Sequence, residues 1–166
     1  MTTPSDIVRD AFAHHTWATL QLLDAVEALD PAVLEQRIDG TYGPVLQTIT
    51  HLVDADDRYL QRLSSANLPP YEDHGTQSIA ELRRRVREHE QRWAAALSLL
   101  DAGALEGRIM GRDDWPDTPH AEGLLLLQAI HHGNDHRTQV CSTLGALGLD
   151  VPDLDGWNYW RSERLT

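Results

Sequence analysis

The sequence predicts an all-α fold, a four-helix bundle. Four segments carry apolar residues at helical spacing, and capping residues, prolines and glycines mark their ends. No segment of useful length shows the alternation of a strand, and no internal repeat is visible. Four amphipathic helices of this length imply a bundle. With 166 residues, the chain is expected to form one domain over residues 1–166 that buries a real core.

The first two predicted helices are bounded by proline and glycine. The first runs from about Asp6 to Leu29, because Pro31 cannot continue it. The second begins after the turn Gly40–Pro44 and extends to about Leu63. The face that its periodicity predicts to be buried comprises Val45, Ile49, Leu52, Val53, Asp56 and Leu60.

The third predicted helix starts at Ser78, with Glu81 three residues later. That pair is typical of a capping box, in which each side chain accepts the backbone N–H of the other residue. His89 falls on the apolar stripe of this helix and is interpreted as a hydrogen-bonded core histidine. The stripe comprises Ile79, Leu82, Val86, Trp93, Leu97 and Leu100.

The fourth predicted helix opens at Thr118 and Pro119, a cap followed by proline at the first helical position. It continues to about Leu147, near the stop signals of two glycines. Its stripe comprises Leu126, Ala129, Ile130, Val140, Leu144 and Leu147. The preceding segment, residues 101–117, is rich in Gly, Asp and Arg and is predicted to be a mobile crossover loop.

The tail over residues 150–166 carries Trp157, Tyr159 and Trp160. Three aromatic side chains in so short a segment predict that it packs back on the bundle or onto a partner subunit. A homodimer is therefore one expectation from the sequence, since bundles with exposed apolar edges often pair.

Composition argues against several classes of partner. The formal net charge of −12 argues against nucleic acid, because phosphate contacts need clustered basic residues. Apolar runs such as Leu124–Leu127 are far too short to span a membrane. No signal peptide is visible, and the single cysteine, Cys141, excludes an intrachain disulfide. A cytoplasmic location is the expectation that follows.

Two histidines of the fourth helix, His132 and His136, are four residues apart. At about 3.6 residues per turn they stack on one side of the helix, as a pair of metal ligands does. On a helical wheel His136 lies roughly 50° and His132 roughly 90° from the centre of the apolar stripe, whereas His131 lies nearly opposite. The spacing leaves two interpretations open, a metal-binding pair or two ordinary histidines at the edge of a buried face.

The other candidate histidines are placed less clearly. His15 lies near the centre of the first helix's apolar stripe, as a hydrogen-bonded core residue or as a residue lining the pocket beside the ligands. His51 falls roughly 160° from the centre of its stripe, which alone makes it a surface residue. It shares that side with Thr48 and Ala55, small residues that permit another helix to approach. Both the position of His51 and the small residues beside it are explained if other helices contact this helix on two sides.

Three segments resemble the DinB/YfiT-like superfamily. Phe12–Leu23 is similar to the first helix of that family, which commonly shows an aromatic-Asn-x-Trp-Ala pattern. Thr50–Tyr59 resembles its second-helix segment, in which a histidine precedes an aromatic residue by about two turns. His132–Gln139 is similar to its fourth-helix signature, His-x-x-x-His-Arg-x-Gln. The resemblance covers nearly the whole chain in order and spacing.

This resemblance implies a bundle with a three-histidine metal site near one end. By motif position the ligands are His51, His132 and His136, holding one divalent ion per chain, with zinc and nickel as the usual candidates. For His51 the motif is preferred over the wheel, because a ligand site must interrupt an apolar stripe somewhere. The sequence departs from the family pattern at His15, where asparagine is frequent, and at Asp135, where another histidine is common.

The resemblance also implies an activity. Some members of the superfamily are thiol transferases or thiol-dependent isomerases that use the metal to hold a low-molecular-weight thiol. A divalent metal stabilises a thiolate, which then attacks an electrophile. The expected partners are therefore a small-molecule electrophile and a thiol. Arg137 and His15 are the candidate catalytic residues. Arg137 could orient an anionic substrate or form an ordinary surface ion pair.

Two other functions fit the same ligands. With bound water in place of a thiol, the site would be that of a metal-activated hydrolase. With a fourth ligand such as His15, it would be the closed site of a non-enzymatic metal-binding protein, regulatory or stress-linked.

Overall fold

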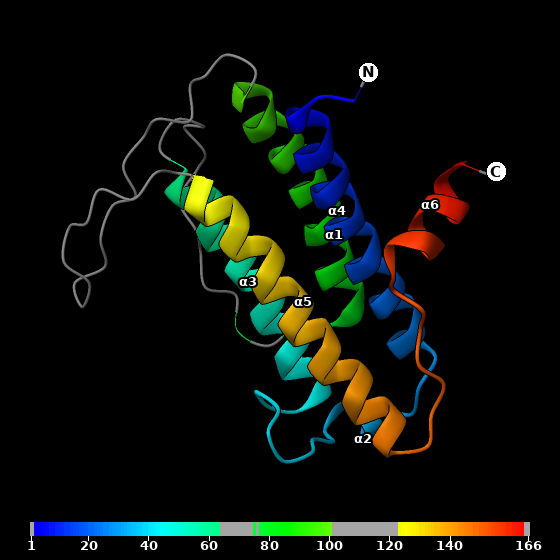
Figure 1. Cartoon of the computed structure of the whole chain (residues 1–166). Coiled ribbons are helices and arrows are strands. Elements are labelled where there is room, and N and C mark those ends of the chain that lie inside the picture. Colours follow the sequence, from blue (N-terminus) through cyan, green and yellow to red (C-terminus); the bar gives the residue numbers. More distant parts are fainter. Residues whose placement is uncertain (1, 64–74, 76, 101–122, 165–166) are drawn as a thin grey trace.

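The structure, a computed structural model, describes residues 2–63, 75, 77–100 and 123–164. In that part of the chain every regular element is helical, which confirms the all-α prediction. The described helices include no segment with the length and apolar character that a membrane span needs. The elements are α1 (Pro4–Glu27), α2 (Pro31–Leu34), α3 (Val45–Arg62), α4 (Ile79–Leu97), a 3₁₀ turn (Ser98–Leu100), α5 (Gly123–Ala146) and α6 (Gly156–Arg164) (Figure 1).

The four long helices form a bundle. Helix α1 packs against α4 and α5, and α3 packs against the same two helices. The order around the bundle is therefore α1, α4, α3, α5, in agreement with the predicted four-helix arrangement (Figure 1). This order makes α3 and α5 neighbours, although a whole helix separates them in the sequence.

The beginning of α1 is fixed by a cap that the sequence already contains. The hydroxyl of Thr3 accepts the backbone N–H of Asp6 at 3.2 Å, and the Asp6 carboxylate accepts the backbone N–H of Thr3 at 2.8 Å. This reciprocal pair is a capping box, and it lets Pro4 occupy the first helical position. The helix therefore starts earlier than the expected Asp6, and it ends at Glu27, before the expected Leu29.

Helix α4 begins where the sequence predicts. The hydroxyl of Ser78 accepts the backbone N–H of Glu81 at 3.2 Å, which is one half of the expected capping box. The Glu81 carboxylate accepts a hydrogen bond at 3.0 Å from Arg84, one turn further along α4. His89 is 2 % exposed, which confirms that it lies in the core.

Helix α5 differs from its prediction at its C-terminal end. It stops at Ala146, because Gly148 adopts a positive φ of 72°, a conformation that glycine tolerates and other residues rarely do. Leu147 was expected on the buried stripe, and this was wrong, since its side chain is 42 % exposed. The expected helix start at Thr118 and Pro119 and the expected loop over 101–117 lie outside the described residues.

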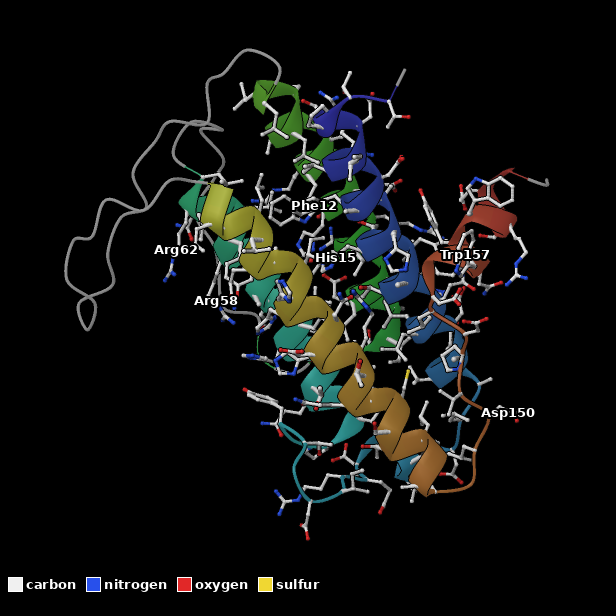
Figure 2. The ribbon with its side chains drawn as sticks, in the orientation of Figure 1. Phe12, His15, Arg58, Arg62, Asp150 and Trp157 are labelled. Carbon is white, nitrogen blue, oxygen red and sulfur yellow. The ribbon has the colours of Figure 1, made fainter. Side chains whose placement is uncertain are left out.

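The aromatic tail forms α6 and packs partly on the bundle. The ring of Tyr159 contacts those of His14 and Trp17 on α1, with centroids 5.6 and 5.5 Å away. Trp157 and Trp160 instead remain exposed (Figure 2 labels Trp157). The expectation that the tail packs back therefore holds for one of the three aromatic residues, and the homodimer stays a prediction.

Two apolar clusters form the core, with buried polar residues between them. One is centred on Leu22, Ile49, Leu52, Leu82 and Leu144, and the other on Phe12, Leu60, Trp93, Leu97 and Ala129. On α1, α3 and α5 buried polar residues fall between the positions of the two clusters, and on α4 His89 does so while Arg85 directly precedes Val86 of the first cluster. They are His15, Thr16 and Thr19 on α1, Asp54, Asp56 and Asp57 on α3, Arg85 and His89 on α4, and His136 and Arg137 on α5. This polar layer requires internal hydrogen bonds, since buried charges are costly without partners.

Gly133 of α5 allows close contact with α1 at this layer. A Cβ at this position would lie 2.2 Å from Cε1 of His15. The His15 ring is held by hydrogen bonds to Asp56 and Arg137 and has no room to yield. We therefore expect Gly133→Ala to lower the free energy of unfolding by about 1–3 kcal/mol, although alanine is the better helix former by about 1 kcal/mol.

Urea unfolding followed by circular dichroism measures this effect. The matched control is Gly145→Ala on the same helix, where a new Cβ meets only Val151 at an ordinary 3.5 Å. That variant should lose no stability. Equal effects from the two substitutions would contradict the clash.

Candidate metal centre

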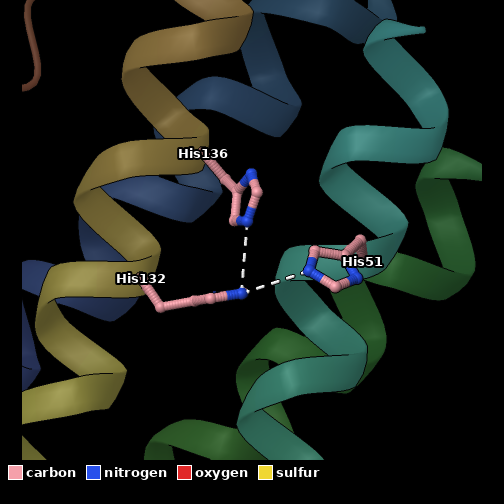
Figure 3. A group of neighbouring side chains, drawn as sticks. All are labelled: His51, His132 and His136. Carbon is pink, nitrogen blue, oxygen red and sulfur yellow. Dashed lines mark hydrogen bonds between the residues drawn. The ribbon is translucent and has the colours of Figure 1, made fainter. Parts of the chain in front are cut away.

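Three histidines from two helices converge at the contact between α3 and α5. His51 extends from α3, and His132 and His136 extend from successive turns of α5 (Figure 3). The Nε2 atom of His132 lies 3.2 Å from Nε2 of His51 and 3.2 Å from Nε2 of His136. One ligand atom from each of the three residues can be chosen so that all lie within 4.8 Å of one another. The structure thus brings together the three residues that the motif positions select.

The position of His51 corrects the helical-wheel placement. The wheel assumes one buried face per helix, but α3 is buried on two faces, one toward the core and one toward α5. Thr48 and Ala55, which lie on the same side as His51, are 1 % and 2 % exposed. Their small side chains let α5 approach, so His51 faces His132 and is half-buried rather than on the open surface.

The donor set fits a divalent transition metal. Imidazole nitrogens bind zinc at about 2.0–2.1 Å, so two ligands of a tetrahedral ion lie about 3.3 Å apart. The two spacings of 3.2 Å at His132 match that value. Three imidazoles without a carboxylate or thiolate also suit zinc or nickel better than calcium or magnesium, which prefer oxygen ligands.

The three histidines are held in the neutral form that a metal requires. Burial, together with the nearby charge of His136, lowers the pKa of His51 and that of His132 to about 4. Burial also lowers the pKa of His136. At neutral pH each ring therefore carries one N–H and one lone pair, so a metal does not have to compete with the second proton of an imidazolium.

Gln139 fixes which nitrogen of His136 carries the proton. The side-chain oxygen Oε1 of Gln139 lies 3.2 Å from Nδ1 of His136 and accepts its N–H. The lone pair is thereby left on Nε2, which faces His132. The same Oε1 also accepts the backbone N–H of Tyr42 at 2.9 Å, so the loop before α3 is tied to the site.

Two tyrosines border the histidines. The ring of Tyr42 stacks on His51 with centroids 4.1 Å apart, and it meets His136 edge-on at 5.3 Å. The ring of Tyr59 meets His132 edge-on at 5.7 Å. Sequence reasoning gave no role to these tyrosines or to Gln139. Tyr59 and Gln139 do lie within the segments that resemble the family, and Tyr42 lies in the turn that precedes α3.

The two candidate catalytic residues lie elsewhere, in the polar layer between α1 and α5. His15, which is labelled in Figure 2, is 1 % exposed, and its Nε2 donates to Asp56 at 2.8 Å. Nη1 of Arg137 reaches Nδ1 of His15 at 3.3 Å and donates to the hydroxyl of Thr19 at 2.9 Å. Neither residue belongs to the described group of candidate metal ligands, so His15 does not close the site as a fourth ligand. Their catalytic roles stay predictions.

Comparison with known proteins gives one match. The sequence model of the DinB family matches residues 1–165, almost the entire chain. Neither the curated proteins nor the solved structures give a match. A family match over this length agrees with the helical bundle and with the three-histidine cluster described above. The chain belongs to the DinB family.

Proposed function

We propose that this chain is a metal-dependent enzyme that transfers a low-molecular-weight thiol to a small electrophile. The observation that carries the proposal is the convergence of the three Nε2 atoms of His51, His132 and His136 from two helices. Three protein ligands leave coordination positions open, which distinguishes a catalytic site from a structural one. Zinc or nickel, one ion per chain, is the proposed metal.

Such an ion supplies one kind of chemistry when bound: it stabilises the thiolate form of a thiol at neutral pH. The residues around it have separate tasks. Gln139 keeps the lone pair of His136 directed at the site, and Tyr42 and Tyr59 provide aromatic surfaces beside the open side. Tyr42 is 48 % exposed, so a substrate can approach across its ring. An electrophile with an apolar or aromatic group suits these walls.

The test is an assay with thiols and electrophiles. Protein loaded with zinc or nickel is incubated with low-molecular-weight thiols and an activated aryl halide, and separately with simple esters and lactones. We expect thiol consumption that requires the metal and is lost in His132→Ala. Ester or lactone hydrolysis without a thiol would show that the hydrolase is the correct alternative. Fully loaded protein without either activity would leave a metal-binding protein that is not an enzyme.

Gln139 provides a prediction about affinity. Removing the partner of a metal-bound histidine typically weakens metal binding by about 10–100-fold. We expect Gln139→Ala to do so, because it frees the His136 ring and releases the Tyr42 backbone. Competition with a chromophoric chelator measures the affinity. The matched control is Gln128→Ala on the same helix, whose side chain bonds the Tyr59 hydroxyl at 3.4 Å and no histidine. A similar loss in both variants would contradict the assigned role.

A further inference from the structure

A cleft lies on the side of α5 away from the three histidines. It has a volume of about 520 Å³ and runs between α5 and the segment that connects α5 to α6. Arg137 and Cys141 lie on its α5 wall, and Asp153 and Asp155 lie on the opposite wall. Within the described lining it contains none of the three histidines, so this site goes beyond the proposed function.

Arg137 brings an incompletely paired charge to this cleft. Its side chain is 3 % exposed, and Nη2 donates to the Asn134 side chain at 2.7 Å. Nη1 uses its donors toward α1, on His15 and Thr19. Among the described residues no carboxylate lies within 4.0 Å of the guanidinium, and Asp56 is reached only through His15. The edge of the guanidinium that carries Nε and Nη2 therefore has N–H groups for which the described chain provides no acceptor. Two neighbouring N–H groups of this kind match the two oxygens of a carboxylate.

The opposite wall carries negative charge in a fixed place. One oxygen of Asp153 accepts the backbone N–H of Asp155 at 3.2 Å, and one oxygen of Asp155 accepts that of Asn158 at 2.7 Å. The second oxygen of each carboxylate accepts no hydrogen bond from the described residues. The segment is attached to α1, because Nε2 of His14 donates to the carbonyl of Leu154 at 2.8 Å. Two carboxylates held in this way attract a cation.

A cleft with a guanidinium on one wall and carboxylates on the other fits a ligand that carries both charges. We propose that it binds a small zwitterion with the head group of an α-amino acid. The ligand carboxylate pairs with Arg137, and the ligand ammonium lies against Asp153 and Asp155. A simple anion is repelled by the two aspartates, and a simple cation is repelled by Arg137.

Cys141 makes this proposal testable on the full-length chain. It is the only cysteine and lies half-buried in the cleft lining, so its reaction with a chromophoric aromatic disulfide reports on this site alone. The reaction rate is measured with and without each neutral α-amino acid from glycine to leucine. At three times its Kd, a bound amino acid should slow modification by about fourfold. The two halves of leucine, 4-methylpentanoate and isopentylamine, should give no protection.

Variants that remove one charge each test whether Arg137 and Asp153 bind the ligand. Asp153→Asn and Arg137→Gln should each abolish protection, and Asp153, which is exposed, can be changed even if the Arg137 variant does not fold. The matched control is Asp150→Asn, an exposed aspartate outside the lining, which should keep full protection. His132→Ala should also keep it, because the cleft is separate from the metal centre. The proposal is overturned if no amino acid protects, if either half protects equally, or if Asp153→Asn and Asp150→Asn behave alike.

Discussion

Replacing His132 by alanine is expected to remove most of the bound metal. The wild-type protein, purified without added metal, should carry about one divalent ion per chain. His132 is the central ligand, since its Nε2 is 3.2 Å from those of both other histidines. Loss of an outer partner already costs about 10–100-fold in affinity, so loss of this ligand should cost more than about 100-fold. Elemental analysis by mass spectrometry measures the content, and His51→Ala should give the same result.

The neighbouring residue provides the control. His131 is exposed and is not part of the group that could hold a metal. His131→Ala removes one imidazole from the same turn of α5 and should leave the metal content unchanged. If both variants lose metal equally, or if wild type carries none after incubation with zinc or nickel, the proposed centre is wrong.

The second large effect is expected on stability, at Asp57. This carboxylate is buried between α3 and α4, where it bonds Arg85 and Arg92 and lies 3.0 Å from Nε2 of His89. Asp57→Ala leaves Arg85, which is 3 % exposed, with one buried carboxylate partner fewer. Breaking a buried ion pair in this way typically costs about 3–5 kcal/mol. We expect a loss of about 3 kcal/mol in the free energy of unfolding, measured by urea titration.

An exposed ion pair on α4 serves as the reference. Glu88 pairs with Arg84 one turn earlier, and both side chains are more than half exposed. Glu88→Ala should therefore change stability by less than about 1 kcal/mol. A small effect at Asp57, comparable to that at Glu88, would show that the buried network contributes little.

The same carboxylate predicts how stability depends on pH. Burial opposes ionisation of Asp57, but His89 and Arg85 outweigh it and hold its pKa well below the usual range. The unfolded chain then binds a proton more readily than the folded one. The stabilisation is fully present above the unfolded pKa of about 3.9 and is lost as the pH falls below it. Unfolding curves between pH 7 and pH 3 should show a smaller pH dependence in Asp57→Ala than in wild type.

Local signals in the sequence predicted the helices well. The cap at Ser78 and the proline after the first helix act within a few residues, so they are visible without the rest of the fold. The capping box of Thr3 and Asp6 was equally visible and explains why α1 starts before the predicted residue. The error at Leu147 arose because periodicity continues past the point where the backbone turns at Gly148.

The candidate site depended on contacts between distant segments. Periodicity could pair His132 with His136, but it placed His51 on the surface because the second buried face of α3 exists only after α5 packs there. The family resemblance supplied what the wheel could not. The partners of Arg137 on α1, His15 and Thr19, were beyond both, since they become its neighbours only in the folded bundle.

The span between the two ligand-bearing helices has one more consequence. His51 and His132 are separated by 81 positions in the chain, yet their rings touch. An ion shared between them would act as a reversible cross-link that closes this long loop. Cross-links of such length lower the entropy of the unfolded chain and thereby raise its free energy by on the order of 4 kcal/mol at room temperature. The melting temperature should therefore rise with free metal concentration and fall after dialysis against EDTA. Thermal unfolding would then measure the fraction of chains that hold a metal, without the need for a substrate.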